Sequence, residues 1–391
     1  MKASIIWDPS VVEYRFGPEH PFNPKRLELT VSLIEEMGLL SRPGLRMEPP
    51  RPATWEELVR IHDPAFVKAV MRLSEEGADL AEAARWGLGT EDTPVFPGMH
   101  QITSLVVGAT LRAAEMVMEG DVLRSFSVAG GLHHAHRRFA NGFCVYSDLG
   151  AAIAWLRQKH DARVLYFDFD AHHGDGVQAL FYEDPNVLTF SIHQTGRFLF
   201  PGTGFVEELG EGDGHGFSLN VPLEPFTEDE SWIQITESLF PEIARAFDPD
   251  VMIIQCGCDG HALDPLTHLR ASTRLYEETM RIVTETADEV CGGRIVATGG
   301  GGYDVWRVVP RAWTLVWAGL TGQDPPDEIP AAWLDRWSPE SPVELPTRLR
   351  DDPSAIEPVE RRADIERINE RSAMNLRSCA IPLIRGWGFG F

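Results

Sequence analysis

The sequence predicts an α/β fold of three layers, in which a mainly parallel sheet carries helices on both faces. Short β-branched or aliphatic runs alternate with longer amphipathic ones, which is the pattern of repeated strand–helix units. Polar clusters follow four of the predicted strands, and ligand sites of parallel sheets lie at the carboxyl ends of their strands. Hydrophobic residues make up 43% of the 391 residues, enough for one large core.

Six segments are predicted to be strands because they are short, rich in Ile, Val and Phe, and end at polar or glycine-containing stretches. These segments span residues 4–7, 125–129, 163–169, 187–193, 251–257 and 294–299.

Helices are predicted where apolar residues recur at helical spacing between these strands. The predicted helices span residues 26–38, 55–73, 102–120, 149–159 and 273–291.

The composition changes near residue 320. Beyond it, the stretches TGQDPPDEIPAAW and WSPESPVELP are rich in proline and acidic residues. We therefore predict one α/β domain over residues 1–320 and an irregular C-terminal extension, 321–391, packed on that domain. One helix is predicted within the extension, at 358–372.

The formal net charge is −24, from 59 acidic and 35 basic side chains. Such a chain lacks the basic face of a nucleic-acid binder, so no nucleic-acid partner is expected. The five cysteines include no CxxC pair, which argues against a disulfide framework and for a reducing compartment. No segment has the features of a signal peptide or a membrane span. We expect a cytoplasmic protein without a membrane partner.

A metal site is predicted from the stretch YFDFDAHHGDG, residues 166–176. In an extended strand Asp170 and His172 point to the same side, and this donor pair suits a borderline divalent ion such as zinc. Asp259 follows another strand and is the natural third ligand, which would leave one position open. A buried ion pair of Asp170 and His172 is the alternative. Cys256 and Cys258 lie beside Asp259, but core packing is the preferred interpretation for them.

The adjacent histidines His133 and His134 follow a glycine pair that lets the backbone turn sharply. They are candidate proton-transfer groups, although extra metal ligands or a solvated loop pair are alternatives. Asp168 and Asp175 are not needed by the metal, and a carboxylate behind an imidazole fixes its tautomer and raises its basicity. Two such pairs would form a general acid/base system.

A glycine run, Gly299 to Gly302, precedes Tyr303. The GK[ST] ending of a phosphate-binding loop is missing, so that function is not expected. The run instead lets the chain pass close to the metal and brings a phenol that can donate to an oxyanion. No role is predicted for His136 or His261.

The ordered motifs resemble those of the histone deacetylase superfamily over residues 1–320. The matching segments are HPFNPKR, GTEDTPVF, AGGLHHAH, NGFC, YFDFDAHHGDG, FPGTG, QCGCDGHALDPL and GGGGY. Within the superfamily the chain is most similar to bacterial acetoin utilization proteins. The resemblance implies the arginase/deacetylase-like three-layer fold in a single domain.

The resemblance implies a catalytic metal, zinc or alternatively iron(II), bound by Asp170, His172 and Asp259. Tyr303 matches the tyrosine that polarises the substrate carbonyl. These residues would belong to an amidohydrolase that removes acetyl groups from lysine side chains of proteins.

Other residues of the family pattern are also present. His134, paired with Asp175, resembles the general base, and His133, paired with Asp168, resembles its electrostatic partner. The family also binds structural potassium, which here would involve Asp168 and Ser191.

The substrate-binding positions implied by the resemblance form an acyl-lysine tunnel. Gly142 and Phe143 match one wall, and Phe200 matches the opposing wall. Leu266 stands where polyamine-selective relatives carry a glutamate, and Asp92 matches the carboxylate that holds the substrate backbone.

The expected partner is thus an acetylated protein or peptide, and the resemblance suggests acetyl-CoA synthetase in acetoin or acetate metabolism. Alternatives are an acetylpolyamine or other small-amide hydrolase, an arginase-like ureohydrolase and a non-enzymatic reader of acetyl-lysine. The segment around Asp259 offers no second D-x-D cluster for a two-metal ureohydrolase.

Overall fold

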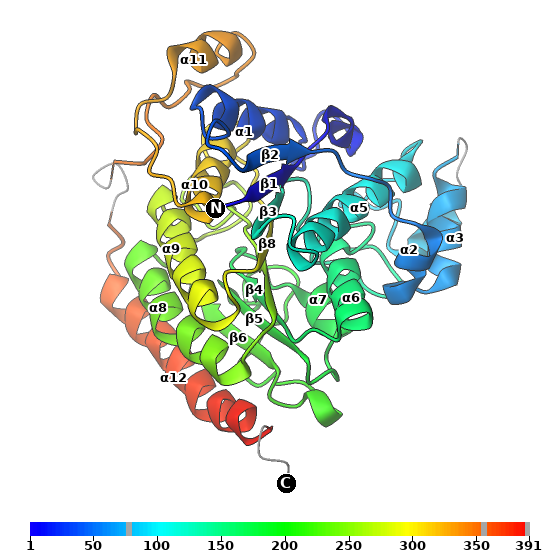
Figure 1. Ribbon diagram of the computed structural model, residues 1–391, viewed down its shortest axis with the longest axis vertical. Coiled ribbons are helices and arrows are strands. Elements are labelled where there is room, and N and C mark those ends of the chain that lie inside the picture. Colours follow the sequence, from blue (N-terminus) through cyan, green and yellow to red (C-terminus); the bar gives the residue numbers. More distant parts are fainter. Residues whose placement is uncertain (76–79, 353–357, 388–391) are drawn as a thin grey trace.

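Eight parallel strands form one sheet between two layers of helices (Figure 1). The computed structural model describes residues 1–75, 80–352 and 358–387. The strand order is β2-β1-β3-β8-β7-β4-β5-β6, and every neighbouring pair is parallel. The predicted α/β class is confirmed.

The six predicted strands are all present, and two further strands were missed. β2 was missed because its sequence, LRME, is charged, and β6 because it contains an asparagine and a proline. Pro222 is tolerated since β6 is the last strand of the sheet. The strands are β1 (Ala3–Ile6), β2 (Leu45–Glu48), β3 (Arg124–Ser127), β4 (Val164–Asp168), β5 (Val187–Gln194), β6 (Ser218–Leu223), β7 (Val251–Gln255) and β8 (Ile295–Thr298).

The helices agree with the predicted ones except at residues 55–73, where one predicted helix is two. The first ends before His62, and Asp63 then caps the second by accepting a hydrogen bond from the amide of Ala65. Pro64 begins that helix, because proline suits a first helical position and disfavours helical backbone in the residue before it. The single helix predicted there is therefore wrong.

Further helices occupy segments for which no helix was predicted, and the C-terminal helix runs longer than predicted. The helices are α1 (Lys25–Glu36), α2 (Trp55–Ile61), α3 (Pro64–Leu73), α4 (Leu80–Ala83), α5 (Met99–Met118), α6 (Asp148–His160), α7 (Asp175–Leu180), α8 (Asp229–Phe247), α9 (Thr273–Val290), α10 (Val309–Thr321), α11 (Ala331–Trp337) and α12 (Arg362–Trp387). Short 3₁₀ turns lie at Pro9–Glu13, Ala84–Trp86 and Gly212–Gly214.

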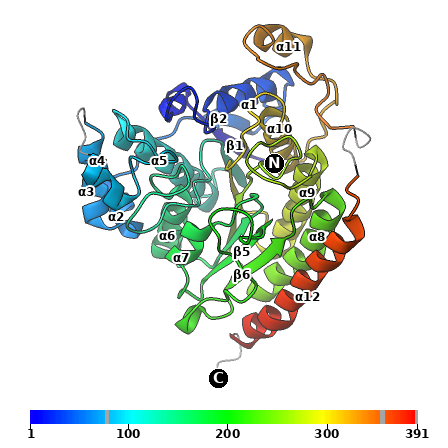
Figure 2. The same cartoon turned by 180° about the vertical axis from the view of Figure 1, so that it is seen from behind.

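The two helical layers differ in composition. α5, α6 and α7 pack together on one face, while α1, α10, α9 and α8 pack in sequence on the other (Figure 1). α12 lies along α8 and beside β6 (Figure 2). Within the described ranges, none of the helices combines the length and the apolar composition needed to cross a membrane.

The strand register brings the polar clusters to one edge of the sheet. Asp168 at the end of β4 lies opposite Ser191 of β5 and Gln255 of β7, and Gln255 lies opposite Thr298 of β8. Thr298 in turn lies opposite Ser127 of β3. The loops that follow β3, β4, β7 and β8 therefore start side by side.

The segment after residue 320 packs against the rest of the chain at several places. Trp333 and Trp337 of α11 join a hydrophobic cluster with Leu29 and Leu33 of α1. Further along, Asn369 of α12 is fully buried and accepts a hydrogen bond from the amide of Glu224, just after β6.

Candidate active site

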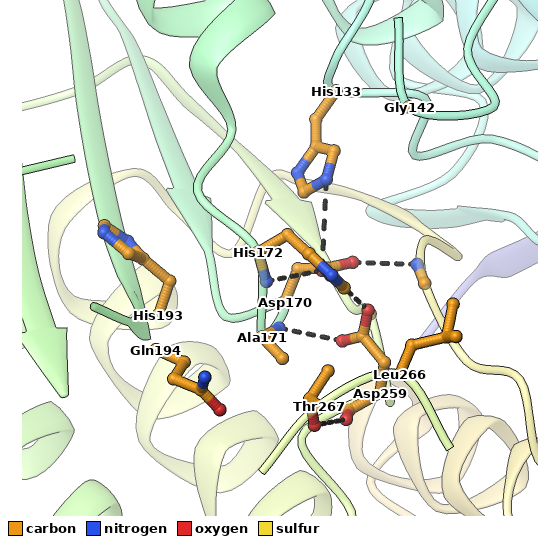
Figure 3. A network of polar contacts seen from close by, with 12 residues as sticks. His133, Gly142, Asp170, Ala171, His172, His193, Gln194, Asp259, Leu266 and Thr267 are labelled. Atoms are coloured by element: carbon orange, nitrogen blue, oxygen red, sulfur yellow. Dashed lines mark hydrogen bonds and ion pairs between the residues drawn. The ribbon is translucent and has the colours of Figure 1, made fainter. Parts of the chain in front are cut away.

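Asp170, His172 and Asp259 converge at the carboxyl edge of the sheet (Figure 3). Each is buried, and one potential ligand atom from each lies within 4.8 Å of the others. Among the described residues, this is the one cluster of three or more His, Cys, Asp or Glu side chains with such a geometry. Asp170 and His172 follow β4, and Asp259 follows β7.

Hydrogen bonds fix the two carboxylates. Asp170 Oδ2 accepts from Gln255 Nε2 and from the amide of Gly301, both at 2.8 Å. Asp259 Oδ1 accepts from the amide of Ala171 at 2.8 Å. A Cβ atom at Gly301 would lie 2.1 Å from Asp259 Oδ2, so only glycine lets the run after β8 pass this close.

The cluster has the electrostatics of a cation site. Burial and the charge of Asp170 raise the pKa of Asp259 to about 6. His172 Nδ1 lies between the two carboxylates, 2.8 Å from Asp259 Oδ2 and 3.2 Å from Asp170 Oδ1. The contact of His172 with Asp170 is the pair considered from the sequence as the alternative. Two carboxylates and an imidazole also form a donor set suited to a borderline ion such as zinc, with a position left open.

His133 and His134 each point one ring nitrogen at a carboxylate. His133 donates from Nδ1 to Asp168 Oδ2 at 2.8 Å, and His134 donates from Nδ1 to Asp175 Oδ1 at 2.6 Å. Their Nε2 atoms lie 3.0 Å apart, and His133 Nε2 faces the cluster, 3.9 Å from Asp170 Oδ1. The structure thus brings both predicted His–Asp pairs to the candidate metal site.

The pKa values of the two imidazoles are shifted in opposite directions. Burial and the neighbouring His133 lower the pKa of His134 to about 4, so this ring is neutral at pH 7 and able to accept a proton. Burial also opposes a charge on His133, but the charges of Asp168 and Asp170 outweigh it and raise the pKa of His133 to about 9. A base and a cationic partner therefore stand side by side.

Tyr303 follows the glycine run and faces the pocket. Its amide donates to Asp264 Oδ2 at 2.8 Å, and its ring meets that of Phe143 edge-on with centroids 5.7 Å apart. Burial and the charges of Asp259 and Asp170 raise the pKa of Tyr303 well above its ordinary value. The phenol therefore keeps its proton and can donate a hydrogen bond.

A pocket of about 400 Å³ opens above these groups. Its walls include the five predicted substrate-binding residues. Phe200 meets His134 edge-on, with ring centroids 4.9 Å apart. The lining residues are His20, Pro21, Glu91, Asp92, His134, Gly142, Phe143, His172, Leu199, Phe200, Leu266 and Tyr303.

The wall at Gly142 and Phe143 has an unusual backbone. Both residues have a positive φ, +49° and +67°. A Cβ atom at Gly142 would lie 2.5 Å from the His134 ring, so this position needs glycine for both its conformation and its space. The turn places Phe143 against the pocket.

Asp168 and Ser191, expected at a potassium site, lie opposite each other on β4 and β5. Asp168 Oδ2 accepts from Tyr166 Oη at 2.5 Å as well as from His133, and Ser191 Oγ lies 2.7 Å from His193 Nδ1. Potassium at these residues stays a prediction.

Cys256 and Cys258 are fully buried and lie outside the candidate metal cluster. Core packing, the preferred interpretation, agrees with this environment. No second metal cluster of three or more ligands occurs within residues 1–75, 80–352 and 358–387, so those residues offer no second site of this kind for an arginase-like centre.

Several residues at the site were missed from the sequence. His20 lines the pocket, and its Nε2 lies 3.2 Å from the carbonyl oxygen of Asp92. Gln255 supports Asp170, and its place at the end of a predicted strand was a usable signal. His136 and His261, which had no predicted role, both bind aspartates: His136 Nε2 lies 3.0 Å from Asp175 Oδ2.

Comparison with known proteins places these features in a wider context. A family model described as the histone deacetylase domain matches residues 20–320. The chain is 46% identical over 373 residues to the acetoin utilization protein AcuC of Bacillus subtilis (strain 168), covering 95% of this chain and 96% of that protein. It is 40% identical over 377 residues to the AcuC of Staphylococcus xylosus, covering 96% of this chain and 97% of that protein.

A solved structure is similar as well. The crystal structure of an HDAC homolog from Aquifex aeolicus superposes with a TM-score of 0.82 at 31% sequence identity. The match covers 95% of this chain and all of that one.

Proposed function

The chain belongs to the histone deacetylase family, and on that premise we propose that it hydrolyses the acetyl amide of Nε-acetyl-lysine in proteins. One observation carries the proposal. Three potential metal ligands, a neutral imidazole and a phenol meet beneath a pocket with two aromatic walls. That pocket suits a flat amide on an apolar stem. The relatives named for acetoin utilization suggest acetoin metabolism as the setting. A cytoplasmic location, a link to acetate metabolism and acetyl-CoA synthetase as a target are further parts of this proposal.

The substrate is held first by its stem and backbone. Phe143 and Phe200 would flank the aliphatic part of the lysine and exclude water. Asp92 at the rim would accept hydrogen bonds from the backbone N–H groups beside the acetyl-lysine. The acetyl group then lies against His134 and Tyr303.

Asp170, His172 and Asp259 would hold a divalent ion, zinc or iron(II). When bound, such an ion supplies Lewis-acid polarisation of a carbonyl and lowers the pKa of a water molecule. His134 would take the proton of the water that attacks the acetyl carbon, and Asp175 would orient the ring. Tyr303 donates to the oxyanion that develops.

Collapse of the tetrahedral intermediate releases the lysine amine and acetate. The amine leaves with a proton from the imidazole pair, so an imidazole acts as base and then as acid. His133, held by Asp168, keeps positive charge beside the reacting oxygens. A structural potassium ion at Asp168 and Ser191 is part of this proposal.

The direct test is a panel of acyl-lysine peptides run beside free acetylated amines on enzyme of defined metal content. We expect the highest kcat/KM for an acetyl-lysine peptide. Higher kcat/KM for N-acetylputrescine or N8-acetylspermidine than for every peptide would overturn the proposal in favour of a polyamine enzyme.

Tyr303→Phe should leave the fold and the metal content intact while turnover collapses. Loss of one oxyanion donor costs about 10²–10³ in kcat. Steady-state kinetics and metal analysis check this result. Tyr182→Phe removes a hydroxyl at a half-buried position outside the pocket and serves as the control. A near-normal rate for Tyr303→Phe would show that the phenol does not assist the carbonyl.

Substrate choice gives a second prediction, at the rim. Asp92→Ala should lower kcat/KM for a peptide about tenfold to a hundredfold, because hydrogen bonds to a charged group contribute roughly 1.5–3 kcal/mol. A small acetylated amine lacks the flanking backbone and should be hardly affected. Glu91→Ala, at the neighbouring exposed carboxylate, reports the effect of charge alone. Equal losses for peptide and amine would contradict the role of Asp92.

Leu266→Glu should raise kcat/KM for acetylpolyamines, by about fivefold, since a solvent-exposed ion pair contributes up to roughly 1 kcal/mol. The same variant should not gain on an acetyl-lysine peptide. A higher kcat/KM for the peptide, or no increase for the acetylpolyamine, would show that residue 266 does not recognise the distant ammonium of a polyamine.

A further inference from the structure

The segment that follows the family domain contacts His261, two residues after the candidate ligand Asp259, through Asp351. We propose that Asp351 is a positioning residue that acts through His261 on the loop of residues 258–266. This loop carries the candidate metal ligand Asp259. Figure 1 shows the segment, in orange, running from α11 towards the first turn of α9. The kinetic side of the inference rests on the proposed function; the contact itself belongs to the fold.

Asp351 accepts hydrogen bonds from three separate elements. Its Oδ2 accepts from His261 Nε2 at 2.8 Å and from the amide of Thr273, the first residue of α9, at 2.9 Å. Its Oδ1 accepts from Arg311 Nη1 of α10 at 2.8 Å. The amide of Asp351 also donates to Thr273 Oγ1 at 2.8 Å. The carboxylate thus joins the loop, the positive end of one helix dipole and a guanidinium.

This junction is shielded from water. The side chain of His261 is 1% exposed, that of Arg311 is 4% exposed and that of Asp351 is 17% exposed. Burial by itself raises the pKa of Asp351, but the hydrogen bond from His261 and the charge of Arg311 outweigh burial and hold this pKa well below its usual range. Removal of the carboxylate would leave Arg311 with an unbalanced buried charge.

The ring and backbone of His261 connect Asp351 to the loop of residues 258–266 and to Tyr303. Its Nδ1 accepts from the amide of Leu263 at 3.1 Å, so the ring proton lies on Nε2 and points to Asp351. Its carbonyl accepts from the amide of Asp264 at 2.8 Å. Asp264 Oδ2 in turn accepts from the amide of Tyr303. One run of hydrogen bonds therefore links the extension to the phenol-bearing turn.

The loop of residues 258–266 supplies both the pocket wall at Leu266 and the candidate metal ligand Asp259. Leu266 donates its amide to Asp264 Oδ1 at 3.0 Å, and Thr267 Oγ1 donates to the carbonyl of Asp259 at 2.6 Å. Figure 3 shows Leu266 and Asp259 of this loop close to Thr267, the residue that follows it. A shift of the loop would therefore move the ligand and the wall together.

The extension also supplies a matched control. Asp327 accepts from the Arg348 side chain at 2.5 Å and from the amide of Arg350 at 2.8 Å, both within the extension. Asp327→Ala removes a carboxylate and two hydrogen bonds from the extension without touching the loop 258–266.

The test compares Asp351→Ala, Asp327→Ala and the unaltered chain by kinetics on an acetyl-lysine peptide and by hydrogen exchange of residues 258–266. Loss of groups that orient metal ligands costs about 10–100-fold in activity or metal affinity. We expect that loss in kcat for Asp351→Ala, a change in KM because the Leu266 wall shifts with Asp259, and faster exchange of the loop. Asp327→Ala should match the unaltered chain in both measurements. Equal kcat and equal loop exchange for all three proteins would overturn the inference.

His261→Leu keeps the pair of Asp351 and Arg311 and so covers the case in which Asp351→Ala does not fold. It should also lower kcat, and the double variant should lose no more than Asp351→Ala alone, because both single variants remove the hydrogen bond between His261 and Asp351. Additive losses would show that the two residues act separately. If the unaltered chain lacks deacetylase activity, the proposed function fails, while the exchange comparison still decides whether Asp351 orders the loop.

Discussion

Asp259→Ala should lose the metal and the activity together. Two of the three proposed ligands, Asp170 and His172, would remain, and the backbone amide of Ala171 would lose its acceptor. Lewis-acid assistance is worth several kcal/mol, and each 1.36 kcal/mol is a factor of ten, so we expect a fall in kcat of about 10³ or more. Metal analysis after dialysis, beside initial rates, measures both effects.

The control for this variant is Asp335→Ala, at an exposed aspartate of α11. It should keep one metal ion per chain and the full rate. An Asp259→Ala protein that retained its metal and turned over normally would show that the ligands lie elsewhere. Two tightly bound transition-metal ions per active chain would favour the arginase-like alternative.

His134→Ala should cost about 10²–10⁴ in kcat, the usual contribution of a positioned general base. The metal content should hold, because His134 lies outside the ligand cluster. Asp175→Asn should cost less, since the imidazole remains and loses only part of its orientation and basicity. Rates on an acetyl-lysine peptide rank the two variants. His160→Ala, at an exposed histidine of α6, is the control and should be silent.

Two results would contradict this assignment. A silent Asp175→Asn variant would show that the pair of His134 and Asp175 has no function in turnover. A His134→Ala protein with most of its activity would shift the role of base to His133, whose Nε2 lies 3.0 Å from that of His134.

The sequence was most informative where chemistry and strand ends coincide. Asp170, His172 and Asp259 were predicted to meet because each follows an apolar strand, and parallel strands share a carboxyl edge. The strand register then determines which loops are neighbours. That register depends on pairings such as β3 with β8, more than 160 residues apart, which local patterns do not contain.

Contacts between segments far apart in the chain could not be predicted from the sequence, for the same reason. His261 looked like an isolated histidine, because its partner Asp351 is 90 residues away in a proline-rich stretch. His136 was missed since Asp175 was already assigned to His134, and a carboxylate has two oxygens to offer. β6 was missed because its composition is poor for a strand, although its position beside β5 makes it one.

The strand order also bears on how the chain folds as it is synthesised. β4, β5, β6 and β7 lie between residues 164 and 255 and form one continuous half of the sheet. β3 precedes them in the chain but joins them only through β8, which ends at Thr298. Chains emerge from the ribosome N-terminus first, and long-range pairings close late. The residues proposed to bind the metal follow β4 and β7 and can therefore come together before the loop of His133 and His134, which follows β3, is placed beside them.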